Sequence, residues 1–273
     1  MGIVQIKNML EDLRLSGMLK SFDALRSRAT KESWTADELL DQLLQSEHQW
    51  REEASSSKRV KGSKLPELPR LEDFDFTVKR AFSKVQIKEL YTLRWLEQGR
   101  PLLLIGPTGV GKSFIAKALG HHACLRKKSV LFIGVSDLLE NQAAARLSGS
   151  YLRFRARMGK PDILILDDFG LRKMLAQEAH DFVDLLKERV GAKSTIITTQ
   201  LPLENWPEVI EDPVIADTII DRLKHISVKI DLSDANIAGW QQSFMSEPLL
   251  SGDNLDNRRA YRVELVIACY FLN

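Results

Sequence analysis

The feature that most constrains this chain is the glycine-rich segment GPTGVGKS at residues 106–113. The apolar run PLLLI precedes it directly, and the helix-forming stretch FIAKALGHHA follows it. A G-x-x-x-x-G-K-[ST] pattern between a strand and a helix is that of a phosphate-binding loop, or P-loop. Its glycines allow successive backbone N–H groups to point at a diphosphate, and the helix N-terminus adds partial positive charge. The segment therefore predicts a nucleotide-binding α/β domain.

The residues of this loop have separate expected roles. Lys112 is expected to reach the β- and γ-phosphates of ATP, and the Ser113 hydroxyl is expected to coordinate Mg²⁺. The whole loop is the expected nucleotide site: Gly106, Pro107, Thr108, Gly109, Val110, Gly111, Lys112 and Ser113.

Short β-type runs alternate with segments of helical length in the part of the chain after about residue 71. Such alternation predicts a mainly parallel sheet covered by helices on both faces. The expected strands are residues 102–105, 130–134, 163–166, 195–198 and 226–230. We therefore expect a five-stranded α/β domain over residues 71–233.

Two acidic residues, Asp167 and Asp168, end the third expected strand in the segment DILILDD. The carboxyl ends of parallel strands form the edge at which α/β sheets bind ligands. Beside a P-loop, Asp167 is expected to hold Mg²⁺ through its water shell, and Asp168 to orient or deprotonate the attacking water. The acid pair therefore favours nucleotide hydrolysis.

Two further polar residues lie where hydrolysis would use them. Gln200 ends the segment STIITTQ, and its amide is expected to sense the γ-phosphate or to position water. The order of P-loop, acidic strand and polar-ended strand is that of additional-strand P-loop ATPases. Arg222 precedes the last expected strand, either as a surface ion pair or as an arginine finger that reaches the γ-phosphate of a neighbouring subunit.

The N-terminal part is predicted to form a small all-α domain over residues 1–50. Apolar residues recur there at helical spacing, and Thr35 with Glu38 matches a capping box at the start of a helix. The apolar face would pack between helices or dock a partner. Residues 51–70 are predicted as a linker because they are basic, rich in serine and contain two prolines. Their charge would keep the linker soluble or follow a phosphate backbone.

Charge is nearly balanced over the 273 residues, with 39 Lys+Arg against 37 Asp+Glu and a formal net charge of +2. Any affinity for nucleic acid must therefore come from local patches. The strongest patch, residues 146–160, has five basic residues and no acid. A strand would place Arg153, Arg155 and Arg157 on one face, whereas a helix would fan them out. With Lys160, they are predicted to contact the DNA backbone with little sequence preference, unless they form only a solvated charged face.

Several other classes of protein are disfavoured by the sequence. Cys124 and Cys269 are far apart and have no partners at ligand spacing, which argues against a disulfide framework or a zinc knuckle. A reducing, cytoplasmic location is therefore expected. No uncharged apolar run is long enough to cross a membrane.

Taken in order, these motifs resemble those of the IstB-like ATP-binding proteins, which assist transposition of bacterial insertion sequences. That family is related to the DnaC helicase loaders and belongs to the AAA+ ATPases. The resemblance rests on LRLSGMLKSFDAL near residue 13, LEDFDF at 71–76, GPTGVGKS at 106–113, LGHHAC at 119–124, LILDDFG at 164–170, STIITTQLPLENW at 194–206 and DPVIADTIIDRLKH at 212–225.

The resemblance implies an AAA+ fold, nucleotide binding by the P-loop, metal and water roles for Asp167 and Asp168, and an inter-subunit finger at Arg222. Gln200 stands where relatives often have Asn. Residues 234–273 depart from the family pattern and are predicted as an atypical C-terminal tail.

The function implied is that of an ATP-dependent, DNA-binding AAA+ ATPase. It would assemble on duplex DNA as a ring or spiral and assist a transposase, with ATP hydrolysis as the switch. The alternative is a DnaC-like helicase loader whose N-terminal helices hold a replicative helicase. A kinase acting on a small molecule is disfavoured, because no acceptor-pocket signature is found and the paired acids suit water activation.

Overall fold

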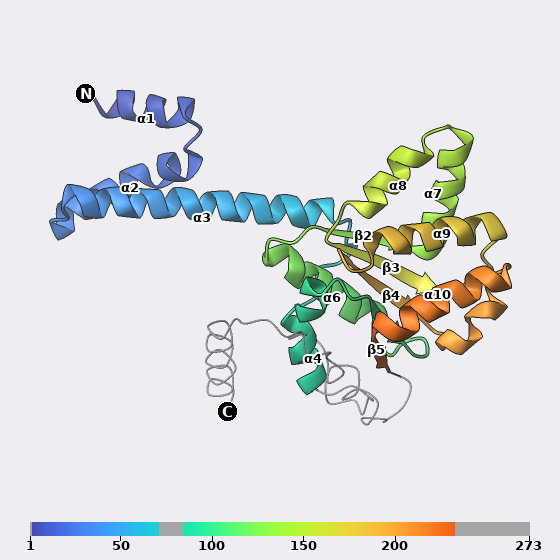
Figure 1. Ribbon diagram of the computed structural model, residues 1–273. Helices are drawn as coiled ribbons and strands as arrows, with labels where there is room; N and C mark the ends of the chain where they lie inside the picture. The colour runs from blue at the N-terminus through green and yellow to red at the C-terminus, as the bar shows by residue number, and fades with distance from the viewer. Residues whose placement is uncertain (1, 71–83, 233–273) are drawn as a thin grey trace, which may run out of the picture. The chain divides into compact units, whose positions relative to one another are not determined.

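The core of the fold is a sheet of five parallel strands in the order β2-β3-β4-β1-β5 (Figure 1). This computed structural model describes residues 2–70 and 84–232. The strands are β1 (Leu102–Ile105), β2 (Val130–Gly134), β3 (Ile163–Phe169), β4 (Ser194–Thr199) and β5 (Val228–Asp231). Every residue of β1 and β4 is buried, as is usual for parallel strands covered on both faces. The predicted five-stranded parallel α/β sheet is confirmed.

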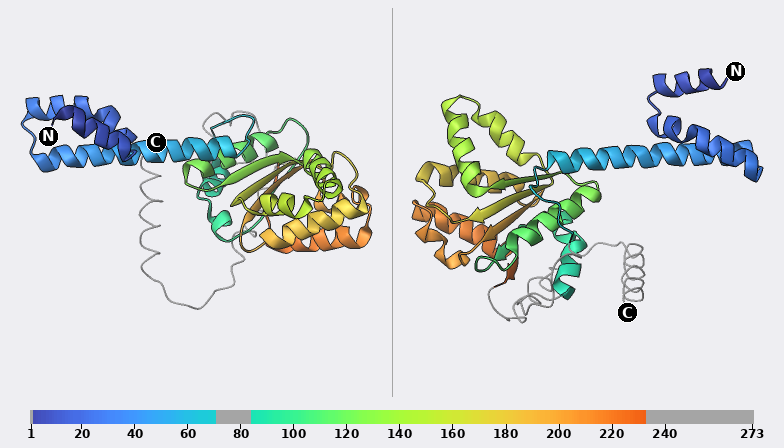
Figure 2. Two further views of the ribbon diagram at one scale, coloured as in Figure 1. Left: turned by 90° about the horizontal axis from the view of Figure 1, so that it is seen from above. Right: turned by 180° about the vertical axis from the view of Figure 1, so that it is seen from behind.

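Helices lie on both faces of this sheet (Figures 1 and 2). α6 covers one face, and Gly120 allows the helix to approach closely, because a Cβ there would lie 2.7 Å from Cδ1 of Ile165. On the other face, α7, α9 and α10 share one apolar core with Leu103 and Ile197. The helices of this domain are α4 (Lys84–Tyr91), α5 (Arg94–Glu97), α6 (Lys112–Leu125), α7 (Val135–Leu147), α8 (Tyr151–Gly159), α9 (Ala176–Arg189), the 3₁₀ helix η2 (Leu203–Glu208) and α10 (Pro213–Ile226).

The N-terminal part consists of α1 (Ile3–Asp12), α2 (Ser16–Glu32) and α3 (Ala36–Gly62) (Figure 1). α3 begins at the predicted capping box. The backbone N of Glu38 donates to Oγ1 of Thr35 (3.2 Å), and the backbone N of Thr35 donates to Oε2 of Glu38 (2.7 Å). None of the helices in residues 2–70 and 84–232 has the length and apolar character needed to span a membrane.

A carboxylate of α3 caps the start of α2. Gly17 lets the two backbones come together, since a Cβ there would lie 2.5 Å from the carbonyl oxygen of Ser46. Buried Glu47 accepts hydrogen bonds from the backbone N of Gly17 (2.7 Å), the backbone N of Met18 (3.2 Å) and Nε of Arg51 (2.7 Å). Burial alone would raise the pKa of Glu47, but these bonds outweigh it and hold the pKa below its ordinary value.

α3 extends into the segment predicted as a linker. The helix continues through residues 51–62. No proline occurs before residue 66, and the Glu, Ala, Lys and Arg residues of this stretch are good helix formers. Two contacts hold this stretch in place: Arg59 Nε donates a hydrogen bond to the carbonyl oxygen of Cys124 in α6 (2.8 Å), and Glu52 forms an ion pair with Lys127, which lies just after α6 (2.8 Å). The predicted domain boundaries remain predictions, and the motif at 71–76 and the tail at 234–273 lie outside the described residues.

Candidate nucleotide-binding site

The P-loop joins β1 to α6 through a backbone that requires glycine. Gly106, Gly109 and Gly111 have φ values of 151°, 85° and 101°. These lie in the region that residues with a Cβ rarely adopt. At Gly106 a Cβ would also lie 3.1 Å from Cβ of Leu232, so space as well as torsion restricts this position. The glycines that identified the motif are therefore the ones that the loop conformation needs.

Lys112 lies within this loop rather than in solvent. Only 5% of the residue is exposed, and its Nζ donates to the carbonyl oxygens of Gly106 (2.7 Å) and Pro107 (2.8 Å). Burial lowers the pKa of Lys112, while the charges of Asp168 and Asp167 act in the opposite direction. A partly desolvated ammonium group attracts a phosphate oxygen more strongly than an exposed one does.

The N-terminus of α6 adds to the attraction for an anion. Gly111 precedes the helix and provides no side-chain hydrogen bond to its first turn. The first-turn N–H groups of an α-helix have no intrahelical acceptor and carry partial positive charge. Lys112 begins this same helix, so the ammonium group and the helix dipole favour negative charge at one place.

The two predicted acids lie at an irregularity of β3. Leu166 pairs with Ile197 of β4, but the next pairing is between Phe169 and Thr199. Asp167 and Asp168 therefore occupy a bulge. Asp167 is buried, whereas Asp168 is exposed and has a φ of 60°.

The electrostatics of the acid pair connect it to the loop. Although the side chain of Asp168 is exposed, loss of water from part of its carboxyl group raises its pKa above the ordinary value; the charge of Asp167 raises the pKa further, while Lys112 and Lys117 oppose the shift. Two carboxylates and the P-loop lysine thus influence one another at the carboxyl edge of the sheet. A carboxylate whose pKa is raised accepts a proton more readily than one at its ordinary pKa.

β4 ends between these two parts of the site. The carbonyl oxygen of Thr199 accepts a hydrogen bond from the backbone N of Gly106 (3.2 Å), and its hydroxyl donates to the carbonyl oxygen of Phe169 (3.0 Å). The hydroxyl of Thr198 contacts both acids. Gln200, the residue predicted from the sequence, follows directly and is exposed. From the sequence, the polar side chains at the end of this strand were expected to sense the γ-phosphate or to position water, and Gln200 rather than the two threonines was singled out.

The donor set fits ATP with Mg²⁺. The Ser113 hydroxyl and the Asp167 carboxylate are oxygen ligands of the kind that Mg²⁺ prefers. In the described part of the chain, no group of three or more His, Cys, Asp or Glu residues could hold a metal ion without further ligands. Mg²⁺ is commonly held by one or two carboxylates together with substrate phosphates, so the phosphates would complete its coordination here.

Arg222 lies on the exposed face of α10, on the helical turn that also carries buried Ile219 and Leu223. It stands near the C-terminal end of the helix, not at the start of a helix or turn. With Asp217 and Asp221 it borders an open surface depression. Within residues 2–70 and 84–232, Arg222 makes no hydrogen bond or ion pair, so its guanidinium group is available to another molecule.

The basic segment is a helix, so the strand alternative is wrong. In α8, Met158 is buried in the hydrophobic core. Phe154, one turn earlier, is partly buried and packs against the same core. This spacing of four fits a helix, which also satisfies its own backbone without a neighbouring strand. Arg153, Arg155 and Arg157 consequently fan out instead of sharing one face.

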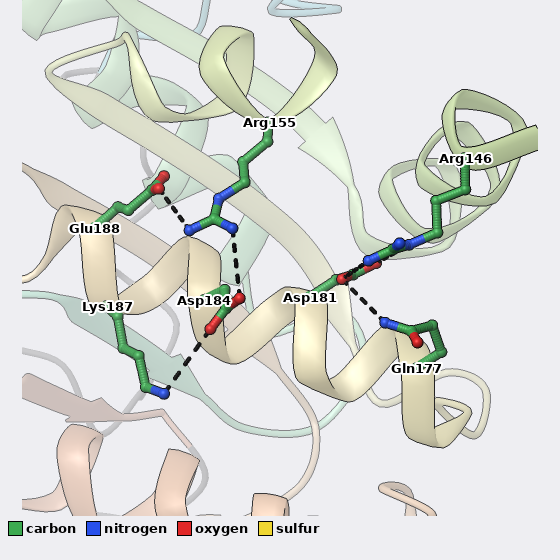
Figure 3. Close-up of polar contacts among 7 residues, drawn as sticks. All are labelled: Arg146, Arg155, Gln177, Asp181, Asp184, Lys187 and Glu188. Atoms are coloured by element: carbon green, nitrogen blue, oxygen red, sulfur yellow. Dashed lines mark hydrogen bonds and ion pairs between the residues drawn. The ribbon is translucent and has the colours of Figure 1, made fainter. Parts of the chain in front are cut away.

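Part of the basic charge is neutralised within the molecule (Figure 3). Arg155 points to α9, where its guanidinium group contacts Glu188 (2.5 Å) and Asp184 (3.4 Å). Arg146 of α7 likewise bonds Asp181 of α9. Among the described residues, no acidic side chain pairs with Arg153 or Arg157 of this segment; both are exposed, and Lys160 is exposed after the helix.

Comparisons with known proteins agree with this geometry. A family model described as IstB-like ATP binding protein matches residues 8–242. A putative insertion sequence ATP-binding protein of Sinorhizobium fredii is 39% identical over 228 residues, covering 84% of this chain and 93% of that protein. A putative ATP-binding protein of insertion sequence IS21 from Pseudomonas aeruginosa is 30% identical over 84% of this chain and 86% of its own length.

A solved structure shows the same fold. AMPPCP-bound DnaA from Aquifex aeolicus superposes with a TM-score of 0.53 and 18% identity, covering 62% of this chain and 51% of that chain. The predicted P-loop fold of the AAA+ type is thereby confirmed.

Replacing Lys112 by Ala is expected to weaken ATP binding by about 10- to 100-fold, because hydrogen bonds to charged groups contribute about 1.5–3 kcal/mol. Titration of a fluorescent ATP analogue or calorimetry would measure the change. Lys88→Ala on α4, which removes an exposed lysine, is the matched control and should bind normally. Unchanged affinity of the Lys112→Ala protein would remove Lys112 from the site.

Proposed function

Because this chain belongs to the family of IstB-like ATP-binding proteins, we propose that it uses ATP to assemble on duplex DNA and to assist the transposase of an insertion sequence. The chain is an ATP-binding AAA+ protein of the insertion-sequence type. The observation that most supports the proposal is the gathering of Lys112, Asp167 and Asp168 at one edge of the sheet. Both curated relatives described above are insertion-sequence proteins, which favours transposition over helicase loading.

ATP hydrolysis is the proposed chemistry of this edge. Residues 106–113 bind the phosphates, and Ser113 and Asp167 hold Mg²⁺, which would neutralise charge on the phosphate oxygens. Asp168 orients the attacking water and accepts its proton while the bond between the γ-phosphorus and the bridging oxygen breaks. ADP and inorganic phosphate are the products. The raised pKa of Asp168 suits this role.

Self-association is proposed from the position of Arg222. The residue is exposed on α10 and has no partner among the described residues. A guanidinium group supplied by a neighbouring subunit can stabilise the charge that develops on a transferring phosphoryl group. Subunits that complete one another's sites in this way would form a ring or a spiral, so that ATP binding would favour the assembled state.

DNA contact is proposed for the exposed side of α8. Arg153, Arg157 and Lys160 present positive charge there without acidic partners in the described chain. Basic side chains neutralise phosphates and release counterions, which gives salt-dependent binding with little dependence on base sequence. Arg155, which the sequence also predicted to contact DNA, is left out of the proposed surface because Asp184 and Glu188 of α9 already pair with its guanidinium group.

The proposal that ATP switches assembly on DNA is tested by comparing assembly in different nucleotide states. The full chain is expected to assemble on duplex DNA with ATP and Mg²⁺, and to assemble poorly with ADP or without nucleotide. Light scattering or sedimentation would measure the assembly, and adding the transposase of a related insertion sequence would test its recruitment in the same series. Equal DNA binding in all three nucleotide states would contradict the proposed switch.

Mixing two inactive variants tests the shared site. Asp168→Asn and Arg222→Ala should each bind ATP, and each should hydrolyse it about 100-fold more slowly or worse, since loss of a proton acceptor or an arginine finger commonly costs that much. An equimolar mixture should recover part of the activity, because some interfaces then pair an intact Asp168 with an intact Arg222. Released phosphate measures the rate. No recovery in the mixture, or full activity of Arg222→Ala alone, would argue against a finger acting between subunits.

The salt dependence of DNA binding tests whether Arg153 and Arg157, but not Arg155, contact DNA phosphates. Arg153→Gln and Arg157→Gln should each reduce the slope of log affinity against log salt by about 0.9, the value for one phosphate contact on duplex DNA. Arg155→Gln is the matched control and should leave the slope unchanged while lowering the melting temperature, because it removes the pairing with α9. Fluorescence anisotropy at several salt concentrations would measure the slopes. If all three changes reduced the slope equally, Arg155 would contact DNA despite its ion pairs with α9.

A further inference from the structure

Thr198 is a polar residue that is completely buried in the sheet. Its exposed fraction is 0%, and it lies on β4 beside the two acids of β3. The hydroxyl of Thr198 donates a hydrogen bond to Oδ1 of Asp167 (2.6 Å) and accepts one from the backbone N of Asp168 (2.9 Å). A hydroxyl has one hydrogen to donate and lone pairs to accept, so one group contacts both acids in different ways.

The bulge of β3 explains why such a group is needed. Asp167 and Asp168 together face one residue of β4, and the regular ladder is interrupted there. A buried backbone N–H that loses its ladder partner must find another acceptor. The hydroxyl of Thr198 provides that acceptor for Asp168. Asp168 also has a left-handed φ of 60°, a conformation that persists in residues with a Cβ only when the surroundings hold it.

The same hydroxyl restricts the carboxylate of Asp167. Oxygen–oxygen hydrogen bonds of about 2.5–2.7 Å are typical when the acceptor is charged. Because Asp167 is 8% exposed, few other orientations are open to its carboxylate. Removing a group that holds a metal-binding side chain in place typically lowers metal affinity or activity by about 10- to 100-fold.

We propose that Thr198 is a positioning residue that holds both acids of the ATP site: it fixes the carboxylate of Asp167 and the backbone of Asp168 through one hydroxyl. This proposal rests on the proposed hydrolysis of ATP. The hydroxyl of Thr198 contacts the two acids themselves. It acts through the geometry of the acid pair, while the P-loop, held by different hydrogen bonds, keeps its own shape.

The strand itself supplies a matched control. Thr195 lies on β4 with 1% exposure, and its hydroxyl also makes a buried hydrogen bond, which it accepts from Nε of Arg189 (3.0 Å). Thr195 lies near the amino end of the strand and does not contact the acids. Thr195→Val and Thr198→Val therefore each remove one buried hydroxyl group from β4. Thr195→Val removes it near the amino end of the strand, and Thr198→Val removes it near the carboxyl end, beside the acids.

Turnover by the full chain, measured with ATP, Mg²⁺ and duplex DNA, is the first test. Thr198→Val is expected to lower kcat by about 10- to 100-fold, the range found when a partner of a metal ligand is removed, with little change in the KM for ATP. Thr198→Ser retains the hydroxyl and should recover most of the rate. Thr195→Val should keep the wild-type kcat, even if it melts at a lower temperature.

Hydrogen exchange supplies a readout that does not depend on turnover. In the nucleotide-free protein, the backbone amide of Asp168 should exchange faster in Thr198→Val than in the wild type, and Thr198→Ser should restore the slow exchange. Thr195→Val should leave this amide unaffected.

Wild-type exchange and wild-type kcat in Thr198→Val would overturn the proposal. An equal loss of kcat in Thr195→Val would also overturn it, because the effect would then reflect general weakening of the strand. A wild-type protein that failed to hydrolyse ATP under all conditions would overturn the proposed hydrolysis instead. The exchange comparison would still decide whether Thr198 holds the acids.

Discussion

The candidate site depends on the hydrogen bonds that hold β4 between β1 and β3. In the sheet order, β4 separates the strand that enters the P-loop from the strand that carries the acids. Thr199 is bonded to Gly106 on one side and to Phe169 on the other. Because parallel strands bring their carboxyl ends to one edge, these bonds set the spacing between the loop and the acids. The phosphate-binding and acidic parts are thus positioned by the strand that lies between them.

The sequence was most informative where the physical cause is local. The P-loop glycines adopt positive φ values, which a sequence motif can report because few other residues tolerate them. Residues 51–62 were predicted as part of a linker from their low apolar content, and their helix propensity was given less weight, although they continue α3. The contacts of Arg59 with Cys124 and of Glu52 with Lys127, which help hold that stretch, join residues far apart in the chain. The role of Thr198 depends on the register of β4 against a bulged neighbour, and no local pattern reports a register.

The number of basic residues in one segment overestimated its basic surface, because contacts with a distant part of the chain neutralise some of them. The segment at residues 146–160 contains no acid, yet the acids that neutralise it lie on α9. Asp181, Asp184 and Glu188 recur at helical spacing on that helix and face the arginines of α7 and α8. The net charge of a segment therefore describes its surface only when the facing element is known, and part of this segment serves to pack the helices together.

Glu47 makes the start of one helix depend on the middle of another. α2 begins at Ser16 without a cap from a side chain of its own, and its first N–H groups bond to the carboxylate of Glu47 on α3. If α3 unwound around Glu47, α2 would lose both this cap and the close backbone contact at Gly17. The contacts at Glu47 and Gly17 therefore couple the stability of α2 to that of α3, and unwinding of α3 is expected to destabilise α2.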